Sequence, residues 1–470
     1  MEPQLPAQAP PPPTRVYLSL SKAVLPEDAS IQISSTFANE EGGRVVVSAS
    51  WVTSDSTVAS FTPSQGSTLS ATSVVLNTHK AGTAILTVSG GGLSTAAVVT
   101  VRPALQFASV AAGGAGDLVL HACALTVSGV AYCWGVNYYG ALGLDTATDD
   151  CGDGCNAVPR PVAGGLAFKA LTASSFTCGA TEPGEVYCWG FGYGPTPAKV
   201  PTDVAVRTLS AGAYHVCGLA SDGSAYCWGS NAFGQLGDGT RQSSDLPIPV
   251  AGGLRFTAIS AGGNHTCGLV TEGVAYCWGS NYVGLALGLQ DTASSAVPTR
   301  VSGDMAFVSV SAGLEHTCGL TQSGQAYCWG ANEYGQLGFI SEGDPTCATP
   351  QSCSQMPGQV SGGITFGLID ASGEYTCGLT QSGQAYCWGG LLVPGTCAPG
   401  RGDNPGGGFG GFPFCIPQLK QVSAPEPLPG TTLFSTRGGR GSCWMGLDGA
   451  AYCWGGVHGS APERVPGQQP

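Results

Sequence analysis

The first part of the chain alternates apolar and polar residues with a period of two. Between residues 14 and 103 this alternation occurs in the short segments RVYLSL, SIQISSTF, RVVVSASWVTSD, TAILTVSG and TAAVVTV. A period of two places the apolar side chains on one face of a strand, and the Gly- and Ser-rich stretches between the segments predict turns. We therefore expect an antiparallel β-sandwich over residues 14–103, preceded by a Pro-rich disordered tether over residues 1–13.

From residue 104 onward the pattern changes to a repeated unit. Copies such as ISAGGNHTCGLVTEGVAYCWGSN and VSAGLEHTCGLTQSGQAYCWGAN contain two cysteines ten residues apart. The first cysteine of the unit stands at positions 123, 178, 217, 267, 318, 377 and 443, an average interval of about 53 residues. Seven units of several short strands predict an all-β chain that ends in a disulfide-rich seven-bladed β-propeller over residues 104–470.

The spacing of the two cysteines predicts a disulfide within each hairpin. In the copy Cys318-GLTQSGQAY-Cys328, a three-residue loop places Cys318 opposite Cys328 at a separation that a disulfide can bridge. The same register sets Gly319 opposite Tyr327, where the missing side chain leaves room for a ring. Two opposed thiols have little freedom to gather further ligands, which disfavours zinc. The seven hairpin pairs are Cys123–Cys133, Cys178–Cys188, Cys217–Cys227, Cys267–Cys277, Cys318–Cys328, Cys377–Cys387 and Cys443–Cys453.

The other six cysteines fall in pairs within elongated connecting loops. We expect them to bond as Cys151–Cys155, Cys347–Cys353 and Cys397–Cys415. Ten pairs then account for all 20 cysteines of the chain. So many regularly spaced cysteines indicate an oxidising compartment, so we expect a secreted, periplasmic or cell-surface protein.

Each unit also has an L-x-F-x-x-V strand before its hairpin and a P-x-x-V strand after it. The first of these begins at Leu105, and the last one spans Pro462 to Val465. We expect residues 105–111 to meet residues 462–465 where the ring closes.

The composition narrows the range of partners. Only 10% of the residues are charged and the net charge is −13, which disfavours nucleic acid because phosphate binding needs clustered Lys and Arg. No apolar run of about 18 residues occurs, so we expect no membrane span and no export signal in the sequence as given.

The repeated segment resembles the regulator of chromosome condensation repeat family. The resemblance is carried by the core C-G-L-T-x-x-G-x-A-Y-C-W-G and by N-x-x-G-Q-L-G at residues 231–237 and 332–338; the second, sixth and seventh units lack the latter. It implies a seven-bladed propeller, a fold that serves in some members as an exchange factor on small GTPases and in one bacterial relative as a β-lactamase inhibitor.

The first segment is similar to bacterial immunoglobulin-like domains of group 2. The similarity rests on SASWVTSDSTVASF around Trp51 and on KAGTAILTVSGGGLSTAAVVTV. It implies that Trp51 is a core residue and that this domain is a spacer or an adhesive module on a bacterial surface.

Several residues are candidates for chemistry. His121, His215, His265 and His316 share one repeat position and would either ring a metal or bond to the backbone in each blade. Asp145, Asp149, Asp150 and Asp153 vaguely follow a calcium-loop pattern, although a solvated acidic tip explains them as well. Residues 401–403 spell Arg-Gly-Asp, an integrin-type motif that also arises by chance. Glu315, Glu333 and Glu374 are candidates for a glycosidase pair, but their spacing singles out no two of them.

Tyrosines that follow the Trp-Gly strands are the best candidates for a binding surface. They are Tyr138, Tyr139, Tyr193, Tyr282 and Tyr334. We expect a non-enzymatic surface protein without cofactor that presents its propeller loops to a protein partner, with the first domain as spacer or adhesive module. Because tyrosines also stack on sugars, a polysaccharide-binding or polysaccharide-active propeller is the alternative, and a structural subunit of an extracellular assembly is a third.

Overall fold

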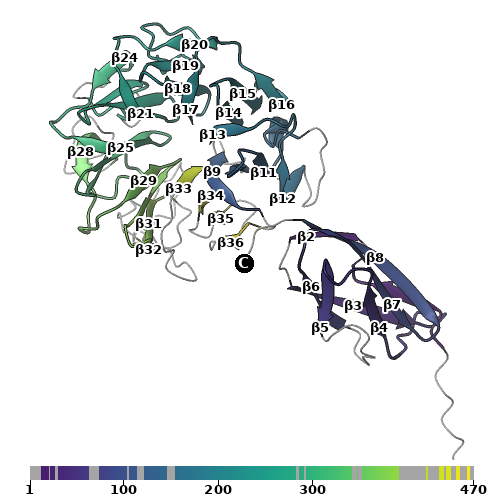
Figure 1. Ribbon diagram of the computed structural model, residues 1–470. Coiled ribbons are helices and arrows are strands. Elements are labelled where there is room, and N and C mark those ends of the chain that lie inside the picture. Colours follow the sequence, from purple (N-terminus) through teal and green to yellow (C-terminus); the bar gives the residue numbers. More distant parts are fainter. Residues whose placement is uncertain are drawn as a thin grey trace, which may run out of the picture. The chain divides into compact units, whose positions relative to one another are not determined.

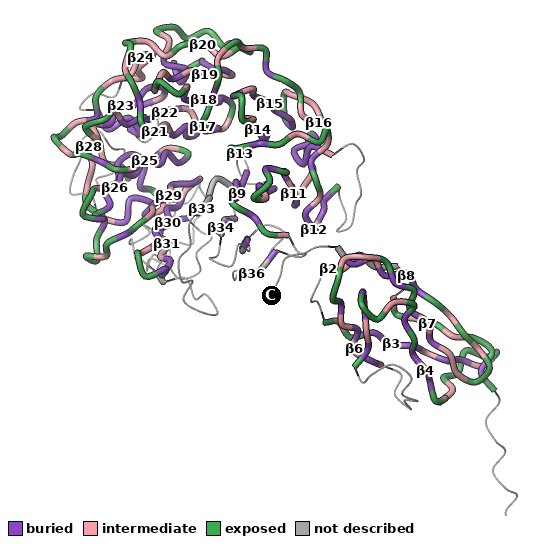
Figure 2. The backbone as a smooth tube through the Cα atoms, viewed as in Figure 1, coloured by how far each residue is buried: buried purple, intermediate pink, exposed green. Residues whose placement is uncertain are grey.

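The computed structural model describes residues 12–20, 22–26, 30–62, 73–102, 105–113, 121–144, 154–281, 285–289, 293–340, 347, 352–390, 420–421, 433–438, 441–445, 451–455 and 463–465. It is an all-β structure, and its chain divides into two compact units. The first comprises Met1–Gln106 with Gly467–Pro470, and the second comprises Phe107–Pro466. Figure 1 shows both units, and in Figure 2 the buried residues concentrate in the strands, whereas the connections are mostly exposed.

The first unit contains two four-stranded sheets that enclose one hydrophobic core. One sheet has the order β1 (Arg15–Leu18), β3 (Ser30–Ala38), β6 (Ser73–Thr78) and β5 (Ala59–Thr62). The other has the order β2 (Lys22–Pro26), β8 (Leu93–Arg102), β7 (Gly82–Gly90) and β4 (Ser50–Thr53). Trp51 is buried in the core and packs against Phe61, with ring centroids 5.7 Å apart.

One strand pair of this unit departs from the antiparallel expectation. β2 pairs with β8 in parallel, in the register Val24↔Thr100. The reason is that β1 and β2 belong to different sheets, so the chain crosses over between them and β2 runs beside the last strand in the same direction. A parallel pair cannot be recognised from alternation, because a strand of either direction shows the same period of two.

The second unit consists of seven antiparallel sheets, each built from four consecutive strands (Figure 1). The first strands are β9 (Phe107–Gly113), β13 (Phe168–Ala173), β17 (Val206–Ala211), β21 (Phe256–Ala261), β25 (Phe307–Ala312), β29 (Leu368–Ala371) and β33 (Leu433–Gly438). The second strands are β10 (His121–Thr126), β14 (Phe176–Thr181), β18 (His215–Ala220), β22 (His265–Val270), β26 (His316–Thr321), β30 (Tyr375–Leu379) and β34 (Gly441–Met445). The third strands are β11 (Ala131–Val136), β15 (Val186–Gly190), β19 (Ala225–Gly229), β23 (Ala275–Gly279), β27 (Ala326–Ala331), β31 (Ala385–Gly389) and β35 (Ala451–Gly455). The fourth strands are β12 (Cys155–Pro161), β16 (Gly194–Lys199), β20 (Ser244–Pro249), β24 (Ser295–Arg300), β28 (Cys353–Gln359), β32 (Lys420–Gln421) and β36 (Glu463–Arg464).

The seven sheets close into a ring through their first strands. Each first strand contacts the first strand of the next sheet, and β33 of the seventh sheet contacts β9 of the first. Closure therefore joins β9 to β33 and β34, and the expected contact of residues 105–111 with residues 462–465 stays a prediction. β36 pairs with β35 at the outer edge of the seventh sheet.

The hairpin of each blade has the register that the sequence predicts. Cys318 pairs with Cys328, Gly319 with Tyr327 and Leu320 with Ala326. The two cysteines are bonded, with their Cα atoms 4.1 Å apart, close to the spacing of non-hydrogen-bonded partners on antiparallel strands.

All seven hairpin disulfides are present, together with Cys347–Cys353. Cys155 is also disulfide-bonded. The predicted pairs Cys151–Cys155 and Cys397–Cys415 involve residues outside the described ranges. Within those ranges no cysteine is free.

The glycine after the first hairpin cysteine makes room for a different ring from the one expected. A Cβ on Gly319 would lie only 2.5 Å from Cδ1 of Phe307, which stands on the neighbouring strand β25. The Phe307 ring therefore covers Gly319, and it meets the edge of Tyr327 at a centroid distance of 6.4 Å. The sequence showed the gap opposite Tyr327, but only the packing of the first strand shows which side chain fills it.

Candidate functional site

The two faces of the propeller are formed by different connections. Because the strands of each blade alternate in direction, the loops from first to second and from third to fourth strand emerge on one face, which we call the loop face. The hairpin turns between second and third strand, with the connections to the next blade, form the opposite turn face. Four of the candidate tyrosines, Tyr138, Tyr139, Tyr193 and Tyr334, fall in loop-face connections.

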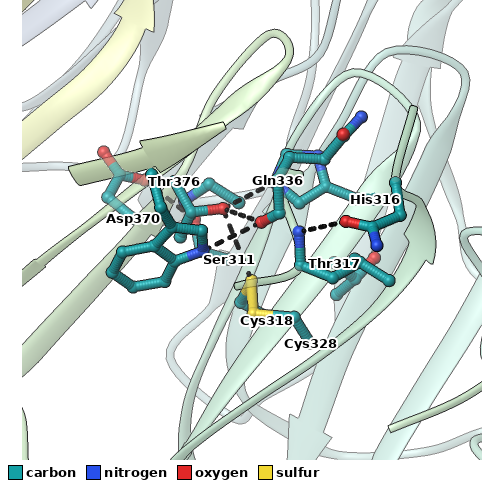
Figure 3. The surroundings of a disulfide bond; sticks show 12 residues. Ser311, His316, Thr317, Cys318, Cys328, Gln336, Asp370 and Thr376 are labelled. Atoms are coloured by element: carbon teal, nitrogen blue, oxygen red, sulfur yellow. Dashed lines mark hydrogen bonds between the residues drawn. A yellow bond between two sulfur atoms is a disulfide. The ribbon is translucent and has the colours of Figure 1, made fainter. Parts of the chain in front are cut away.

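The candidate histidines lie in the seams between blades, where they tie one blade to the next. Nε2 of His316 lies 2.9 Å from Oγ1 of Thr376 in the following blade (Figure 3). Thr376 donates its own hydrogen to the carbonyl of Gln336 at 2.8 Å, and Trp388 Nε1 donates to the same carbonyl at 3.0 Å. Since Thr376 has one hydrogen and gives it to Gln336, it accepts from His316, whose Nε2 therefore carries the proton.

This arrangement recurs around the ring. The equivalent His–Thr contacts are His121–Thr177 at 2.8 Å, His215–Thr266 at 2.8 Å and His265–Thr317 at 2.9 Å. Their Thr hydroxyls in turn donate to the carbonyls of Ala141, Gln235 and Ala286. The histidines at this repeat position thus connect adjacent blades, because each one bonds a threonine side chain of the next blade.

Burial keeps these imidazoles neutral. Loss of solvent lowers the pKa of His121 and of His265 to about 4, and burial together with nearby His265 lowers the pKa of His316 to about 3. Each histidine bonds its own threonine rather than a common centre. In the part of the chain that the structure describes, no three His, Cys, Asp or Glu side chains are grouped to hold a metal ion.

Exposed aromatic side chains form a continuous row over the first three blades on the loop face. Tyr138 and Tyr139 meet edge to face with centroids 4.1 Å apart, Tyr139 meets Phe191 at 5.1 Å, and Phe191 meets Tyr214 at 6.2 Å. Their exposed fractions are 53%, 55%, 41% and 52%. We call these four residues the aromatic arc.

The backbone at the centre of the aromatic arc is strained. Tyr139 has φ of 53°, and among the described residues only Leu285 shares a positive φ without being glycine. Phe233 and Tyr334 occupy the same place in N-x-x-G motifs of other blades, and neither has a positive φ. An L-residue in the left-handed region costs about 1 to 2 kcal/mol, so blade 1 holds this ring outward at an energetic cost that Phe233 and Tyr334 do not have.

The five candidate tyrosines divide into three groups. Tyr138 and Tyr139 belong to the aromatic arc, whereas Tyr193 is half-buried and packs against Phe176, with centroids 5.4 Å apart. Burial raises the pKa of the Tyr193 hydroxyl. Tyr334 is half-buried, its backbone N–H bonded to Oε1 of Gln336, and Tyr282 lies outside the described residues.

Sequence reasoning missed Phe191 and Tyr214. Phe191 does follow a Trp-Gly strand, as the tyrosines do, and was overlooked because only tyrosines were considered. Tyr214 stands on the loop between the first and second strands, and nothing in its spacing connects it with residues 138 and 139. Their contact across blades arises only from the ring.

The three candidate glutamates gather on the loop face at blades five and six. Burial raises the pKa of the Glu315 carboxyl, and repulsion from Glu333 and Glu374 adds to the rise. They come from three loops that the ring brings together. The remaining candidates, Asp145, Asp149, Asp150, Asp153 and the tripeptide at 401–403, lie outside the described residues.

Comparison with known proteins agrees with the fold. The family described as RCC1-like domain matches residues 75–392. This match begins within the first unit, but strands β6, β7 and β8 pack into that unit's own core, so the ring itself starts at Phe107. Among solved structures, yeast RCC1 (Prp20) has a TM-score of 0.58 at 23% identity, covering 70% of this chain and 78% of that one. Human WBSCR16 has a TM-score of 0.56 at 18% identity, covering 72% and 93%.

The chain spans about half to two thirds of the length of the named relatives that it matches. The ultraviolet-B receptor UVR8 of Arabidopsis thaliana is 29% identical over 296 residues, 57% of this chain and 63% of the relative. The secretion-regulating guanine nucleotide exchange factor of Bos taurus is 31% identical over 243 residues, 46% of this chain and 51% of the relative. Because the family match spans more than half of the chain and agrees with the ring of four-stranded sheets, this protein belongs to the RCC1-like domain family.

Proposed function

We propose that this protein is a secreted or cell-surface binding protein without catalytic activity, which presents the loop face of its propeller to a protein partner. The observation that carries the proposal is the aromatic arc, because exposed Tyr and Phe side chains in contact are typical anchors of protein interfaces. The arc consists of three phenols and one phenyl ring and contains no acid–base pair. Its chemistry therefore suits contact rather than turnover.

The disulfides support an oxidising compartment. Every blade has one across its central hairpin, and thiols in the cytosol or nucleus are kept reduced. The N-terminal unit then acts as spacer or adhesive module, in the manner of a bacterial immunoglobulin-like domain of group 2. This part of the proposal rests on the motif around Trp51 and on the two sheets around one core.

Nucleotide exchange is the activity in the name of the Bos taurus relative. We do not transfer it to this chain, because the match covers 51% of that relative and because blades with a disulfide in each hairpin suit a compartment without small GTPases. Nucleic acid, a membrane and cofactors have no part in the proposal. Among the described residues no helix is long and apolar enough to cross a membrane.

A crosslinking experiment tests which face meets the partner. A photoreactive phenylalanine analogue is placed at Phe191 on the loop face or at Val127, which is 82% exposed on the turn face. Each protein is irradiated on the surface of its source cells. The proposal expects one defined protein adduct from position 191 and none from position 127. Equal adducts from both positions, or none from position 191, would contradict it.

A thiol assay tests the compartment independently. Protein isolated from its source without reductant is denatured and titrated for reactive thiols. We expect at most two per chain, and a larger number would show that the blades are reduced where the protein works.

A further inference from the structure

We infer that the aromatic arc binds the cationic side chains, lysine or arginine, of its partner. This inference deepens the proposed function and rests on it, since it names the chemistry that the loop face recognises. It is carried by the orientation of the four rings and by the charges that share their face.

The rings of the arc are tilted against one another rather than coplanar. Successive interplanar angles are 62° for Tyr138 and Tyr139, 67° for Tyr139 and Phe191, and 62° for Phe191 and Tyr214. An ammonium or guanidinium group needs only the face of a single ring within about 6 Å of its centroid, so rings that are tilted against one another can still bind it. A polysaccharide chain stacks on flat rings that share a plane, and the arc offers no such common plane. The geometry therefore favours a cation over a glycan.

The charges on the loop face also favour a cationic partner. In the described loops of this face, the charged residues are Asp238, Arg241, Glu315, Glu333 and Glu374. Four carboxylates thus stand against one guanidinium, and Arg241 is already engaged with the carbonyl of Ser294 at 3.4 Å in the next blade. The resulting negative potential attracts a basic segment to the face on which the aromatic rings are exposed.

The three carboxylates at blades five and six add a second reason. Glu333 and Glu374 both repel Glu315, and a bound cation reduces this repulsion. An extended basic segment lying across the loop face would place one part on the arc and another beside these carboxylates. The aromatic arc supplies ring faces that contact the cation, and the carboxylates supply the negative electrostatic potential of the loop face.

Binding of oligo-lysine tests the inference. Fluorescently labelled ten-residue oligo-lysine and oligo-arginine are titrated with the oxidised full-length chain, and anisotropy reports binding. The double variant Tyr139→Ala/Phe191→Ala should weaken binding about tenfold, because two ring faces are lost while the net charge stays at −13. Leu246→Ala and Val127→Ala, at exposed apolar positions away from the loop face, serve as matched controls and should leave binding unchanged.

The remaining arms separate the alternatives. Glu333→Gln should weaken binding about two- to threefold and make it less sensitive to salt. Equal binding by the wild type and the double variant would overturn the inference, since the peptides would then follow net charge alone. Tighter binding of a neutral glucan hexasaccharide than of either peptide would overturn it in favour of a sugar. A protein adduct at position 191 without measurable peptide binding would overturn the inference and leave the proposed function standing.

Discussion

The interior seams of the propeller and its aromatic arc differ in how far they follow the repeat. In the seams, one pattern of His, Thr, carbonyl and Trp recurs from blade to blade, with the same contacts at nearly the same distances. In the arc, Tyr139 has a positive φ, which its counterparts Phe233 and Tyr334 do not have. The pattern repeated at these four seams joins neighbouring blades, whereas the contacts of the arc are confined to the first three blades.

Acidification should weaken the seams more than any single substitution. The folded pKa values of His121, His265 and His316, about 4, 4 and 3, lie below the ordinary value of 6.5. The unfolded chain therefore binds more protons as the pH falls through 6.5, and the free energy of unfolding decreases. From pH 7.5 to pH 5 the loss is about 2 kcal/mol per histidine.

Denaturant unfolding at the two pH values measures this loss. The variant His121→Gln should show a flatter pH dependence than the wild type. An unfolding midpoint that stays constant between pH 7.5 and 5 would show that the buried imidazoles do not control stability.

A methyl group added at Gly319 should destabilise the protein, because the Phe307 ring packs directly on this glycine. Gly319→Ala places a Cβ 2.5 Å from that ring, so we expect a loss of about 1 to 3 kcal/mol from overpacking. Gly367→Ala is the control, because its Cβ would meet nothing closer than 3.6 Å. Thermal unfolding of both variants compares them. If the two midpoints fall equally, the repeated glycine serves backbone freedom rather than the ring.

The threonine of the seam should matter through its hydroxyl group. Thr376→Val keeps the shape but leaves Nε2–H of His316 and the Gln336 carbonyl with one partner fewer each. Unsatisfied buried groups of this kind cost about 1 to 3 kcal/mol. Thr208→Val, at an exposed position of β17, should change stability by less than about 0.5 kcal/mol. Equal stabilities of the two variants in denaturant would show that the hydrogen bonds of the seam do not contribute to the free energy of unfolding.

The smallest effect on the free energy of unfolding is expected for a substitution in the aromatic arc, and it should be a gain rather than a loss. Tyr139→Gly relieves a positive φ, so stability should stay constant or rise by up to about 1 kcal/mol. Phe233→Gly, at the equivalent position without a positive φ, should lower it. Calorimetric unfolding of the pair checks this difference. A loss at Tyr139 as large as that at Phe233 would mean that the arc serves stability rather than recognition.

Much of the fold follows from local patterns. The ten-residue spacing of cysteines set the hairpin register, because a three-residue turn leaves one pairing that opposes Cys318 and Cys328. The repeat interval gave the number of blades, and alternation indicated the strands of the first unit. The direction of β2 and the closure of the ring did not follow, since they depend on which distant strands meet.

The candidate site was predicted only in part. Position after a Trp-Gly strand indicated Tyr138 and Tyr139, which are exposed on the loop face, but it treated Tyr193 and Tyr334 as their equals, although both of these are half-buried. Burial depends on the neighbouring blade, which the repeat alone does not describe. The histidines had two interpretations for the same reason, and the threonine of the following blade decided between them.

The sequence by itself determined the repeat, the hairpin register and the cysteine pairing across each hairpin, because these depend on residues fewer than a dozen positions apart. Only the tertiary structure decided which rings touch. Tyr139, Phe191 and Tyr214 stand in three different blades, and closure of the ring is what brings them into one row. Contacts between blades join residues about 50 positions apart, where no period in the sequence specifies a partner and where only packing can select one.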